Sequence, residues 1–439
     1  MISMIKVYFK QACTLMKQHR LFTGIYILGT GLSIALVMTL FIIFYVKFAP
    51  IYPEYNRNRT LTIKAMLRTA KDNSGNWSLN SGVSYYMVSE LLKEFPHMEA
   101  LGATMMDYWS ENTLSRPDGE SFVLKGVNYT NAGFWQAFTF DFIQGIPYTP
   151  EQEEGRIPVA VISAALSQRL FATTASTGRK FLLNGREFTV CGVVKDVSNA
   201  TPATAGNLWV PLSHDALTLF SKSTGDLVGN IQVYLVAPTA ADKGALREEV
   251  INMLATYNSQ IEEYCFDMYN QPDDYWLGTF REASYDCGQL EPWDVLKKYI
   301  FILLAFLIIP ALNLSGMISS RMDSRLSEVG VRKAYGASNG NLVTQVLWEN
   351  LLLTCIGGVL GLLLSYLIVL NSSSWILTLF DSWISSPGQD YAITFEMLFN
   401  PVIFCSALLF CIVLNLGSAL IPTIWALRKS IISSIHSKL

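Results

Sequence analysis

The chain has 439 residues, of which 51% are hydrophobic and only 15% charged, and its mean hydropathy of +0.30 argues against a wholly soluble protein. Residues 50–296 hold 18 Lys/Arg and 29 Asp/Glu, whereas the rest of the chain holds 14 and 6, so an acidic block lies between basic ends. No basic patch with interleaved aromatic residues indicates a nucleic-acid partner.

The first 46 residues predict a basic surface helix followed by a membrane span. Residues 1–20 carry four Lys/Arg and no acid, with apolar residues at helical spacing, which predicts an amphipathic cytoplasmic helix. A basic flank that only orients the chain stays open as an alternative. Residues 21–46 are uncharged, and they exceed both the ~20 residues that span a bilayer and the ~7–15 of a signal peptide. They predict a retained transmembrane helix 1.

Residues 47–298 are predicted to form a large α+β extracytoplasmic domain inserted between transmembrane helices 1 and 2. The β-rich runs are Phe122–Val127, Val159–Ile162, Phe188–Val194, Leu208–Pro211 and Ile231–Val236, and the helical stretches are Tyr85–Phe95, Ala164–Phe171 and Ala241–Tyr257. Asn184-Gly185 lies between two apolar runs and predicts a tight hairpin, because both turn positions tolerate positive φ.

Three further apolar stretches complete a predicted α-helical membrane protein with four transmembrane helices. The segments after the domain are transmembrane helix 2 (299–320), a cytoplasmic segment (321–340), transmembrane helix 3 (341–370), a periplasmic loop (371–400), transmembrane helix 4 (401–427) and a cytoplasmic tail (428–439). In helix 3, Gly357, Gly358 and Gly361 form a small-residue face on which another helix can pack closely.

The distribution of basic residues predicts how these helices are oriented. Lys and Arg occur in residues 1–20, in 321–340 and after 427, whereas 371–400 contains none. By the positive-inside rule both termini and the 321–340 segment are predicted to be cytoplasmic, and the large domain lies outside.

The residue types needed for catalysis or metal binding are not arranged in any recognisable motif. No phosphate-binding loop, nucleophile elbow or zinc-binding pattern occurs, so we expect no catalytic residue, no metal site and no cofactor in this chain. Cys265 and Cys287 both lie in the exported domain, where a disulfide is chemically permitted. The sequence leaves open whether they are bonded.

Residues 321–340 are a short, charge-dense segment between two membrane spans. Arg325, Glu328 and Arg332 recur three or four residues apart and therefore share one helical face. Residues 336–338, Gly-Ala-Ser, predict a helix end followed by a new N-cap. A loop that only anchors topology is the alternative, and it explains the basic residues but not the embedded Glu328.

These residues and the exported block resemble one known family. RLSEVGVRKAYGAS at 325–338, followed by Gln345, Glu349-Asn350 and Gly357-Gly358-x-x-Gly361, is similar to the FtsX-like permease domain of MacB-type ABC transporters. The exported block resembles that family's periplasmic core domain. Its motifs follow the order Phe134-x7-Phe142-x2-Gly145, IPVAVISAALSQRLF, FLLNGREFTVCGVVKDV and LWVPL. The resemblance covers nearly the whole chain.

The resemblance implies a permease subunit that dimerises, as a homo- or heterodimer, and is driven by separate cytoplasmic ABC ATPase subunits that bind ATP and Mg. By position, the ATPase-coupling residues would be Arg325, Glu328, Gly330, Arg332, Lys333, Gly336 and Ala337. Transmembrane helices 1 and 2 would extend outward as a stalk, and ATP-driven closure would change the shape of the periplasmic domain. The implied role is export or efflux from the periplasm, in the bacterial inner membrane, with a periplasmic adaptor and an outer-membrane channel as further partners.

Two features depart from the family pattern. Only twenty residues precede the first span, whereas MacB carries its ATPase fused at that end, so we expect the ATPase to be a separate chain. The tail RKSIISSIHSKL also lacks the proline that usually follows the last basic pair.

Two other functions remain as alternatives at the level of sequence. The first is a complex that transports nothing and instead regulates an envelope enzyme or a sensor kinase by the same mechanical relay. The second is a membrane-anchored receptor whose exported domain binds ligand passively, without an ATPase. The sequence does not identify a cargo.

Overall fold

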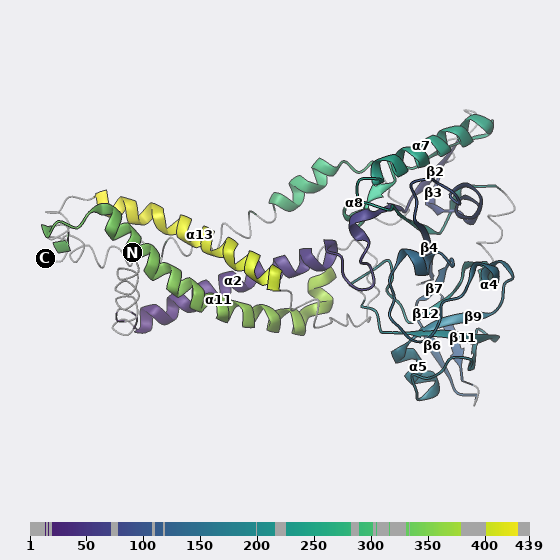
Figure 1. The fold of residues 1–439 in the computed structure, drawn as a ribbon, viewed down its shortest axis with the longest axis horizontal. Coiled ribbons are helices and arrows are strands. Elements are labelled where there is room, and N and C mark those ends of the chain that lie inside the picture. Colours follow the sequence, from purple (N-terminus) through teal and green to yellow (C-terminus); the bar gives the residue numbers. More distant parts are fainter. Residues whose placement is uncertain are drawn as a thin grey trace. The chain divides into compact units, whose positions relative to one another are not determined.

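The computed structural model describes residues 20–71, 78–107, 110–116, 119–198, 200–215, 225–281, 289–301, 331–332, 334–378 and 401–428, together with residues 14, 16, 304 and 316. The chain divides into two compact units, and some of their helices and strands are labelled in Figure 1. Unit 1 comprises residues 1–45, 296–376 and 395–439, and unit 2 comprises residues 46–295 and 377–394.

Unit 1 is built from long apolar helices. Its described helices are α2 (Arg20–Phe48, whose last turn belongs to unit 2), α11 (Asn339–Thr378) and α13 (Pro401–Arg428). Ile34, Val37 and Met38 of α2 form a buried cluster with Cys411 of α13. The three helices therefore bury apolar side chains against one another.

Among the residues that the structure describes, two helical stretches are long and apolar enough to cross a membrane. They are Thr23–Phe48 and Asn339–Asn371, each with a hydropathy of 2.4. Helix α13 covers the predicted fourth span and contains a shorter apolar stretch, Phe404–Leu414. Most of the predicted second span (299–320) lies outside the described residues, so the count of four spans stays a prediction. Helix α11 also extends beyond residue 370, through Thr378.

Unit 2 is dominated by a large mixed sheet. Its strand order is β16-β1-β14-β4-β7-β12-β9-β11-β10-β5-β6, and β8 pairs with β11. The bounds are β1 (Thr60–Ile63), β4 (Ala100–Asp107), β5 (Asn112–Ser115), β6 (Ser121–Leu124), β7 (Val127–Thr130), β8 (Phe142–Gly145), β9 (Val159–Ser163), β10 (Lys180–Leu183), β11 (Arg186–Val194), β12 (Leu208–Pro211), β14 (Gln232–Val236) and β16 (Asp273–Asp274).

A smaller sheet and several short helices complete unit 2. The smaller sheet has the order β13-β3-β2-β15, with bounds Val228–Gly229, Ser78–Val83, Met66–Ala70 and Tyr264–Asp267. The helical elements are η1 (Arg57–Arg59), η2 (Met87–Leu91), α3 (Phe134–Ala137), α4 (Pro150–Glu154), α5 (Ala164–Phe171), η3 (Leu212–His214), α7 (Lys243–Gln260) and α8 (Tyr275–Gly278). This confirms the predicted α+β class of the large domain.

Local signals in the sequence account for several of these elements. The β10–β11 hairpin turns at Asn184 and Gly185, which have φ of 50° and 80°, as the predicted turn requires. Helix α5 has the predicted bounds, and the Ser163 hydroxyl caps its first turn by accepting a hydrogen bond from Leu166 N (3.1 Å).

Two predicted elements differ in the structure. The run Phe122–Val127 was expected to be one strand, but it divides between β6 and β7 because Gly126 has φ +76°, which interrupts the extended backbone. The stretch Tyr85–Phe95 was expected to be a full helix and forms only a short π-helical turn, η2. Pro96 disfavours helical geometry at Phe95, but nothing in the structure explains why the turn already ends at Leu91.

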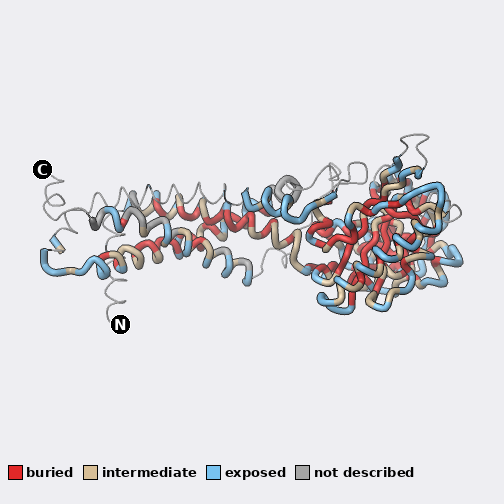
Figure 2. Tube along the Cα trace, turned by 90° about the horizontal axis from the view of Figure 1, so that it is seen from above, coloured by how far each residue is buried: buried red, intermediate tan, exposed pale blue. Residues whose placement is uncertain are grey.

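Residues of both sheets contribute to the buried interior of unit 2. In Figure 2 buried residues (red) fill the inside of unit 2, beneath exposed loops and strand ends (pale blue). One core is strongly aromatic, with Phe134, Trp209 and Tyr234 buried together. Another lies where Leu246 and Val250 of α7 contact Leu61 and the smaller sheet. The sheet is therefore rigidly packed, which makes it a firm body for any element attached to its edge.

Candidate functional site

The coupling segment, residues 321–340, is described only at its C-terminal end. Arg332, Gly336 and Ala337 lie within the described residues, whereas Arg325, Glu328, Gly330 and Lys333 lie outside them. Gly336 has φ +88°, and Ala337 N donates to Arg332 O at 3.0 Å. This six-to-one hydrogen bond around a left-handed glycine is the Schellman arrangement that ends a helix. The predicted helix end at Gly336 is thereby confirmed.

Helix α11 begins immediately after this helix end. The Ser338 hydroxyl accepts a hydrogen bond from Asn341 N at 3.2 Å, and Ser338 O accepts one from Leu342 N at 3.2 Å. Ser338 is therefore the N-cap that the sequence predicted. The coupling segment consequently joins α11 through a tight turn with little slack between them.

A polar chain runs from the coupling segment into α11, and we call it the polar relay (Arg332, Gln345 and Glu349). Arg332 Nη1 donates to Gln345 Oε1 at 2.5 Å, and Gln345 Nε2 donates to Glu349 Oε1 at 3.2 Å. Gln345 is 5% exposed and Glu349 only 2%. Buried polar groups of this kind are costly unless they are hydrogen-bonded, so the relay fixes the position of Arg332 on the helix.

A second buried polar contact lies one residue further along α11. The hydroxyl of Tyr26 on α2 donates to Asn350 Oδ1 at 3.3 Å, and Asn350 is 2% exposed. Because Asn350 follows Glu349 directly, the relay and the α2–α11 contact are adjacent on the same helix. In the sequence, Gln345 and Glu349-Asn350 stand out only as parts of a family motif. The helical spacing of four between Gln345 and Glu349 was the signal that could have joined them.

The three glycines of α11 lie where other helices approach closely. A Cβ at Gly357 would lie 2.4 Å from Thr30 Oγ1 of α2, and one at Gly361 would lie 2.7 Å from Gly31 O. A Cβ at Gly358 would lie 2.7 Å from Leu408 Cδ1 of α13. At Gly357 and Gly361 only glycine leaves room for the approach of α2, whereas at Gly358 the Leu408 side chain could shift. Helix α11 therefore packs against α2 through small residues and also contacts α13.

The cysteines and possible metal ligands form no site in the part of the chain that the structure describes. No group of three or more His, Cys, Asp or Glu side chains there could hold a metal ion. Cys265 is exposed and unbonded, and Cys287 lies outside the described residues, so their pairing stays untested. Cys191 donates to Ala160 O at 3.3 Å, and burial raises the pKa of its thiol to about 12, which makes it an unreactive core residue.

Profiles of two protein families match this chain. The MacB-like periplasmic core domain matches residues 23–253, and the FtsX-like permease C-terminal domain matches residues 300–431. The two matches cover unit 2 up to α7 and the part of unit 1 that holds the polar relay. They follow each other in the order that the sequence motifs predicted.

Curated relatives are similar to about half or more of the chain. YknZ of Bacillus subtilis, an uncharacterized ABC transporter permease, is 22% identical over 55% of this chain and 56% of its own length. The macrolide export ATP-binding/permease protein MacB of Nitrobacter winogradskyi is 25% identical over 62% of this chain and 39% of its own length. The chain thus spans about half of YknZ and less of MacB.

Solved structures give weaker likenesses. The periplasmic region of MacB from Actinobacillus actinomycetemcomitans matches with a TM-score of 0.31 and 17% identity, over 46% of this chain and 88% of that one. The extracellular domain of YknZ matches with a TM-score of 0.32 and 16% identity, over 47% and 99%. On the strength of the family profiles, one of which covers more than half of its length, the chain belongs to the MacB/FtsX-like family of ABC transporter permeases.

Proposed function

We propose that this chain is the membrane subunit of an ABC transporter that transmits ATP-driven motion from separate cytoplasmic ATPase subunits to its extracytoplasmic domain. The proposal places it in the bacterial inner membrane with four transmembrane helices and both termini in the cytoplasm. It acts as a dimer with a second permease subunit. The transported direction is export or efflux from the periplasm, with a periplasmic adaptor and an outer-membrane channel as further partners.

The polar relay is the observation that carries this proposal. Arg332 is one of the residues that the family resemblance assigns to ATPase coupling, and it donates to Gln345, which donates to the buried Glu349. A loop that only anchored topology would gain nothing from a buried connection into α11, because its charge acts from the membrane surface. A coupling segment needs such a connection, because displacement of Arg332 then moves a helix and not only a loop.

The tight turn between the coupling segment and α11 supports the same proposal. Gly336 ends one helix and Ser338 begins the next, so a push on the first is passed to the second over two residues. The glycine contacts of α11 with α2 then bring the displacement to the helix that continues into unit 2. Among the proposed coupling residues, Arg325, Glu328, Gly330 and Lys333 would contact the ATPase directly.

The export direction rests on the relatives. MacB is named as a macrolide exporter, and PvdT of Pseudomonas putida, 23% identical over 62% of this chain and 38% of its own length, is named as a pyoverdine exporter. Both names also include an ATP-binding part. We therefore propose export of a periplasmic molecule as the function. The chemical class of that molecule is set by residues of unit 2 and not by the coupling segment.

The proposal is tested by isolating the chain from its native membranes under mild detergent and identifying co-purified proteins. We expect an ABC ATPase subunit, and its absence would count decisively against the proposal. A variant with both Arg325→Glu and Glu328→Arg should insert normally but hydrolyse ATP without export. The matched control, Lys180→Glu with Glu187→Lys, reverses an exposed ion pair on the β10–β11 hairpin and should export normally.

Sidedness provides an independent check on the same proposal. Single cysteines replacing Arg332 and Asn184 should react with a membrane-impermeant maleimide from opposite sides of the membrane in oriented vesicles. The wild-type chain supplies the background from its own seven cysteines. Labelling of both positions from one side would remove the mechanical link between the coupling segment and the exported domain.

A further inference from the structure

The last turn of α2, at the start of unit 2, carries backbone carbonyls that the helix itself cannot satisfy. In an α-helix the carbonyl of Val46 would accept a hydrogen bond from the N–H four residues later, but residue 50 is proline and has no N–H. Arg57 supplies the missing hydrogen-bond donor. Its Nη1 donates to Val46 O at 2.7 Å and to Ala49 O at 2.8 Å.

The guanidinium of Arg57 is itself held by a buried carboxylate. Arg57 Nε donates to Glu54 Oε2 at 2.8 Å, and Nη2 lies 2.8 Å from the same oxygen. Glu54 also accepts hydrogen bonds from the hydroxyl of Thr204, at 3.0 Å, and from that of Tyr275. We call this pair the entry anchor (Glu54 and Arg57), because it lies where the chain enters the domain.

The surroundings of the entry anchor favour the charged form of Arg57. The Arg57 guanidinium lies 5.0 Å from the centre of the Tyr275 ring, a cation–π distance. Burial alone would lower the pKa of Arg57, but the nearby Tyr275 and Glu54 oxygens raise it above its usual value. Burial also raises the pKa of the Tyr275 hydroxyl well above 10, so that hydroxyl stays a donor to Glu54.

A second buried ion pair lies where the sheet of unit 2 ends, and we call it the exit anchor (Asp273 and Arg281). Arg281 Nε donates to Asp273 Oδ2 at 2.6 Å and Nη2 donates to Oδ1 at 3.1 Å, a two-pronged contact. Asp273 belongs to β16, which pairs with β1 in the register Thr62↔Asp273. Since Arg57 begins η1 and β1 follows η1 directly, the two anchors lie on adjoining elements.

Further contacts tie the two anchors to each other. Tyr275, which donates to Glu54, begins α8 directly after β16. The rings of Phe48, at the end of α2, and Phe280 lie 5.5 Å apart. Lys64 Nζ donates to Gly278 O at 2.8 Å. The last turn of α2 and the segment 273–281 are therefore fixed to one edge of the large sheet.

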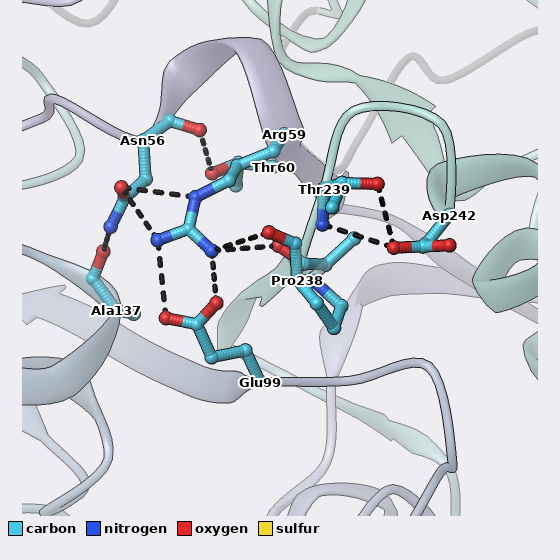
Figure 3. A network of polar contacts seen from close by, with 9 residues as sticks. Asn56, Arg59, Thr60, Glu99, Ala137, Pro238, Thr239 and Asp242 are labelled. Atoms are coloured by element: carbon cyan, nitrogen blue, oxygen red, sulfur yellow. Dashed lines mark hydrogen bonds and ion pairs between the residues drawn. The ribbon is translucent and has the colours of Figure 1, made fainter.

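Arg59 extends this fixation to neighbouring strands, as Figure 3 shows. Its guanidinium binds Asn56 Oδ1 at 3.0 Å and Glu99 Oε1 at 3.1 Å, and it donates to Ala237 O at 2.9 Å. Asn56 Nδ2 in turn donates to Ala137 O at 3.0 Å. The two arginines of η1 thus have different roles. Arg57 binds the end of α2, and Arg59 binds the body of the sheet.

Burial separates the two anchors from the other ion pairs among the described residues. The anchor side chains are at most 3% exposed, whereas in every other pair both partners are at least 19% exposed. A buried ion pair is often no more stabilising than well-packed apolar residues of the same volume. Such a pair mainly fixes the orientation of the groups that it joins, because charge-assisted hydrogen bonds hold their partners in one geometry.

We propose that the entry and exit anchors are positioning ion pairs that join the last turn of α2 to the edge of the large sheet without a hinge. Resting on the proposed function, this means that unit 2 follows a displacement of the end of α2 as a rigid body. The Arg57 side chain bridges back across residues 50–56 to the carbonyls of Val46 and Ala49. Arg57 is the main positioning residue, because it alone among the anchor residues binds carbonyls of the helix end.

The test is hydrogen–deuterium exchange of the full-length chain in lipid nanodiscs, without any ATPase. A double variant, Glu54→Leu with Arg57→Met, removes both charges at similar volume, so the core stays filled and no charge is left unpaired. We expect amides of residues 45–49 to exchange about tenfold faster or more, while amides of β9 and β11 keep their protection. The control double variant, Lys180→Met with Glu187→Leu, removes an exposed pair and should change neither region.

Unchanged exchange at residues 45–49 in the double variant would overturn the proposal. Should that variant fail to fold, Arg57→Lys gives the same decision, because lysine keeps a charge beside Glu54 but cannot span both carbonyls. It should also raise exchange at residues 45–49, and protection equal to wild type would again refute the anchor.

A second measurement separates this proposal from the proposed function. In the complex with its ATPase, the double variant should hydrolyse ATP while nucleotide no longer changes the exchange pattern of unit 2. If no ATPase is found, the proposed function fails, but the nucleotide-free result at residues 45–49 still decides whether the anchors hold the helix end. If nucleotide still changes unit 2 fully in the double variant, the rigid connection is wrong while the transporter assignment stands.

Discussion

Both units of this chain bury charged side chains, but they connect them differently. In unit 2 the entry anchor is closed, because Glu54 and Arg57 bind each other and their remaining polar atoms bind neighbouring backbone and hydroxyl groups. In unit 1 the polar relay leads from the buried Glu349 through Gln345 to Arg332, at the end of the proposed coupling segment. The closed network holds one geometry, whereas the relay connects a helix to the segment that we propose contacts the ATPase. On that proposal, buried polar groups fix one geometry in unit 2 and transmit displacement in unit 1.

Breaking the closed network on one side should have the largest effect. Arg57→Met leaves the Glu54 carboxylate buried without its cation, so the free energy of unfolding of unit 2 should fall by about 3–5 kcal/mol. Thermal or urea unfolding of the full-length chain in detergent measures this loss.

The exposed pair on the β10–β11 hairpin is the matched control for this prediction. Lys180→Met removes the cation of a pair whose side chains are 58% and 57% exposed, so stability should stay within about 1 kcal/mol of wild type. Equal losses in Arg57→Met and Lys180→Met would mean that burial of the entry anchor has no energetic consequence.

Overfilling the helix contact in unit 1 should have the next largest effect. In Gly361→Val the new Cβ would lie 2.7 Å from Gly31 O and 2.9 Å from Ile34 Cβ, so α2 and α11 must separate. We expect a loss of about 1–3 kcal/mol in the stability of the helices, measured by thermal unfolding in detergent. Gly417→Val in α13 is the control, since no described atom lies within 4 Å of a Cβ there, and it should be close to neutral.

Interrupting the relay should lower stability less than the two changes above, and it should mainly reduce export. Gln345→Leu removes the side chain between Arg332 and Glu349, and we expect about 1 kcal/mol of destabilisation with a much larger loss of export per ATP hydrolysed. The control is Ser365→Ala, because the buried Ser365 hydroxyl donates to Leu362 O of its own helix, at 2.8 Å, and takes no part in the relay. Export per ATP that falls equally in both variants would argue against the relay.

A surface contact of unit 2 should give the smallest effect, as a pH dependence. His97 Nδ1 lies 2.6 Å from Glu249 Oε1, and this hydrogen bond raises the pKa of His97 above its usual value of about 6.5. A raised folded-state pKa contributes stability that is present below about pH 6.5 and is lost as pH rises through the folded value. The melting temperature of wild type minus that of His97→Gln should therefore shrink between pH 6 and pH 8. A difference that grows over this range would contradict the ion pair.

The sequence predicted those parts of the fold that neighbouring residues determine. Asn184-Gly185 predicted its hairpin, and Gly336 with Ser338 predicted the end of one helix and the start of the next, because backbone conformation at these positions depends on the residue itself. The entry anchor could not be predicted in this way. Tyr275 lies 221 residues from Glu54, and only the pairing of β16 with β1 brings them together.

The relay shows where prediction of the site fell short. Glu349 entered the sequence analysis only as part of a family motif, whereas the structure buries it and joins it to Gln345. Charge pattern alone predicts which residues share a helix face, and it does not tell whether that face meets solvent or another helix. Tertiary packing of α2 against α11 supplies the missing information, through Tyr26 and Asn350.

Proline at position 50 has a consequence for how the length of the following segment can vary. The guanidinium that replaces its missing N–H comes from a residue only eight positions after Ala49 and eleven after Val46. The contact between Arg57 and the two carbonyls therefore requires a fixed number of residues between them. Substitutions at exposed positions in this segment leave that number unchanged. Inserting or deleting one residue would move Arg57 away from the carbonyls and uncouple the helix from the domain that it carries.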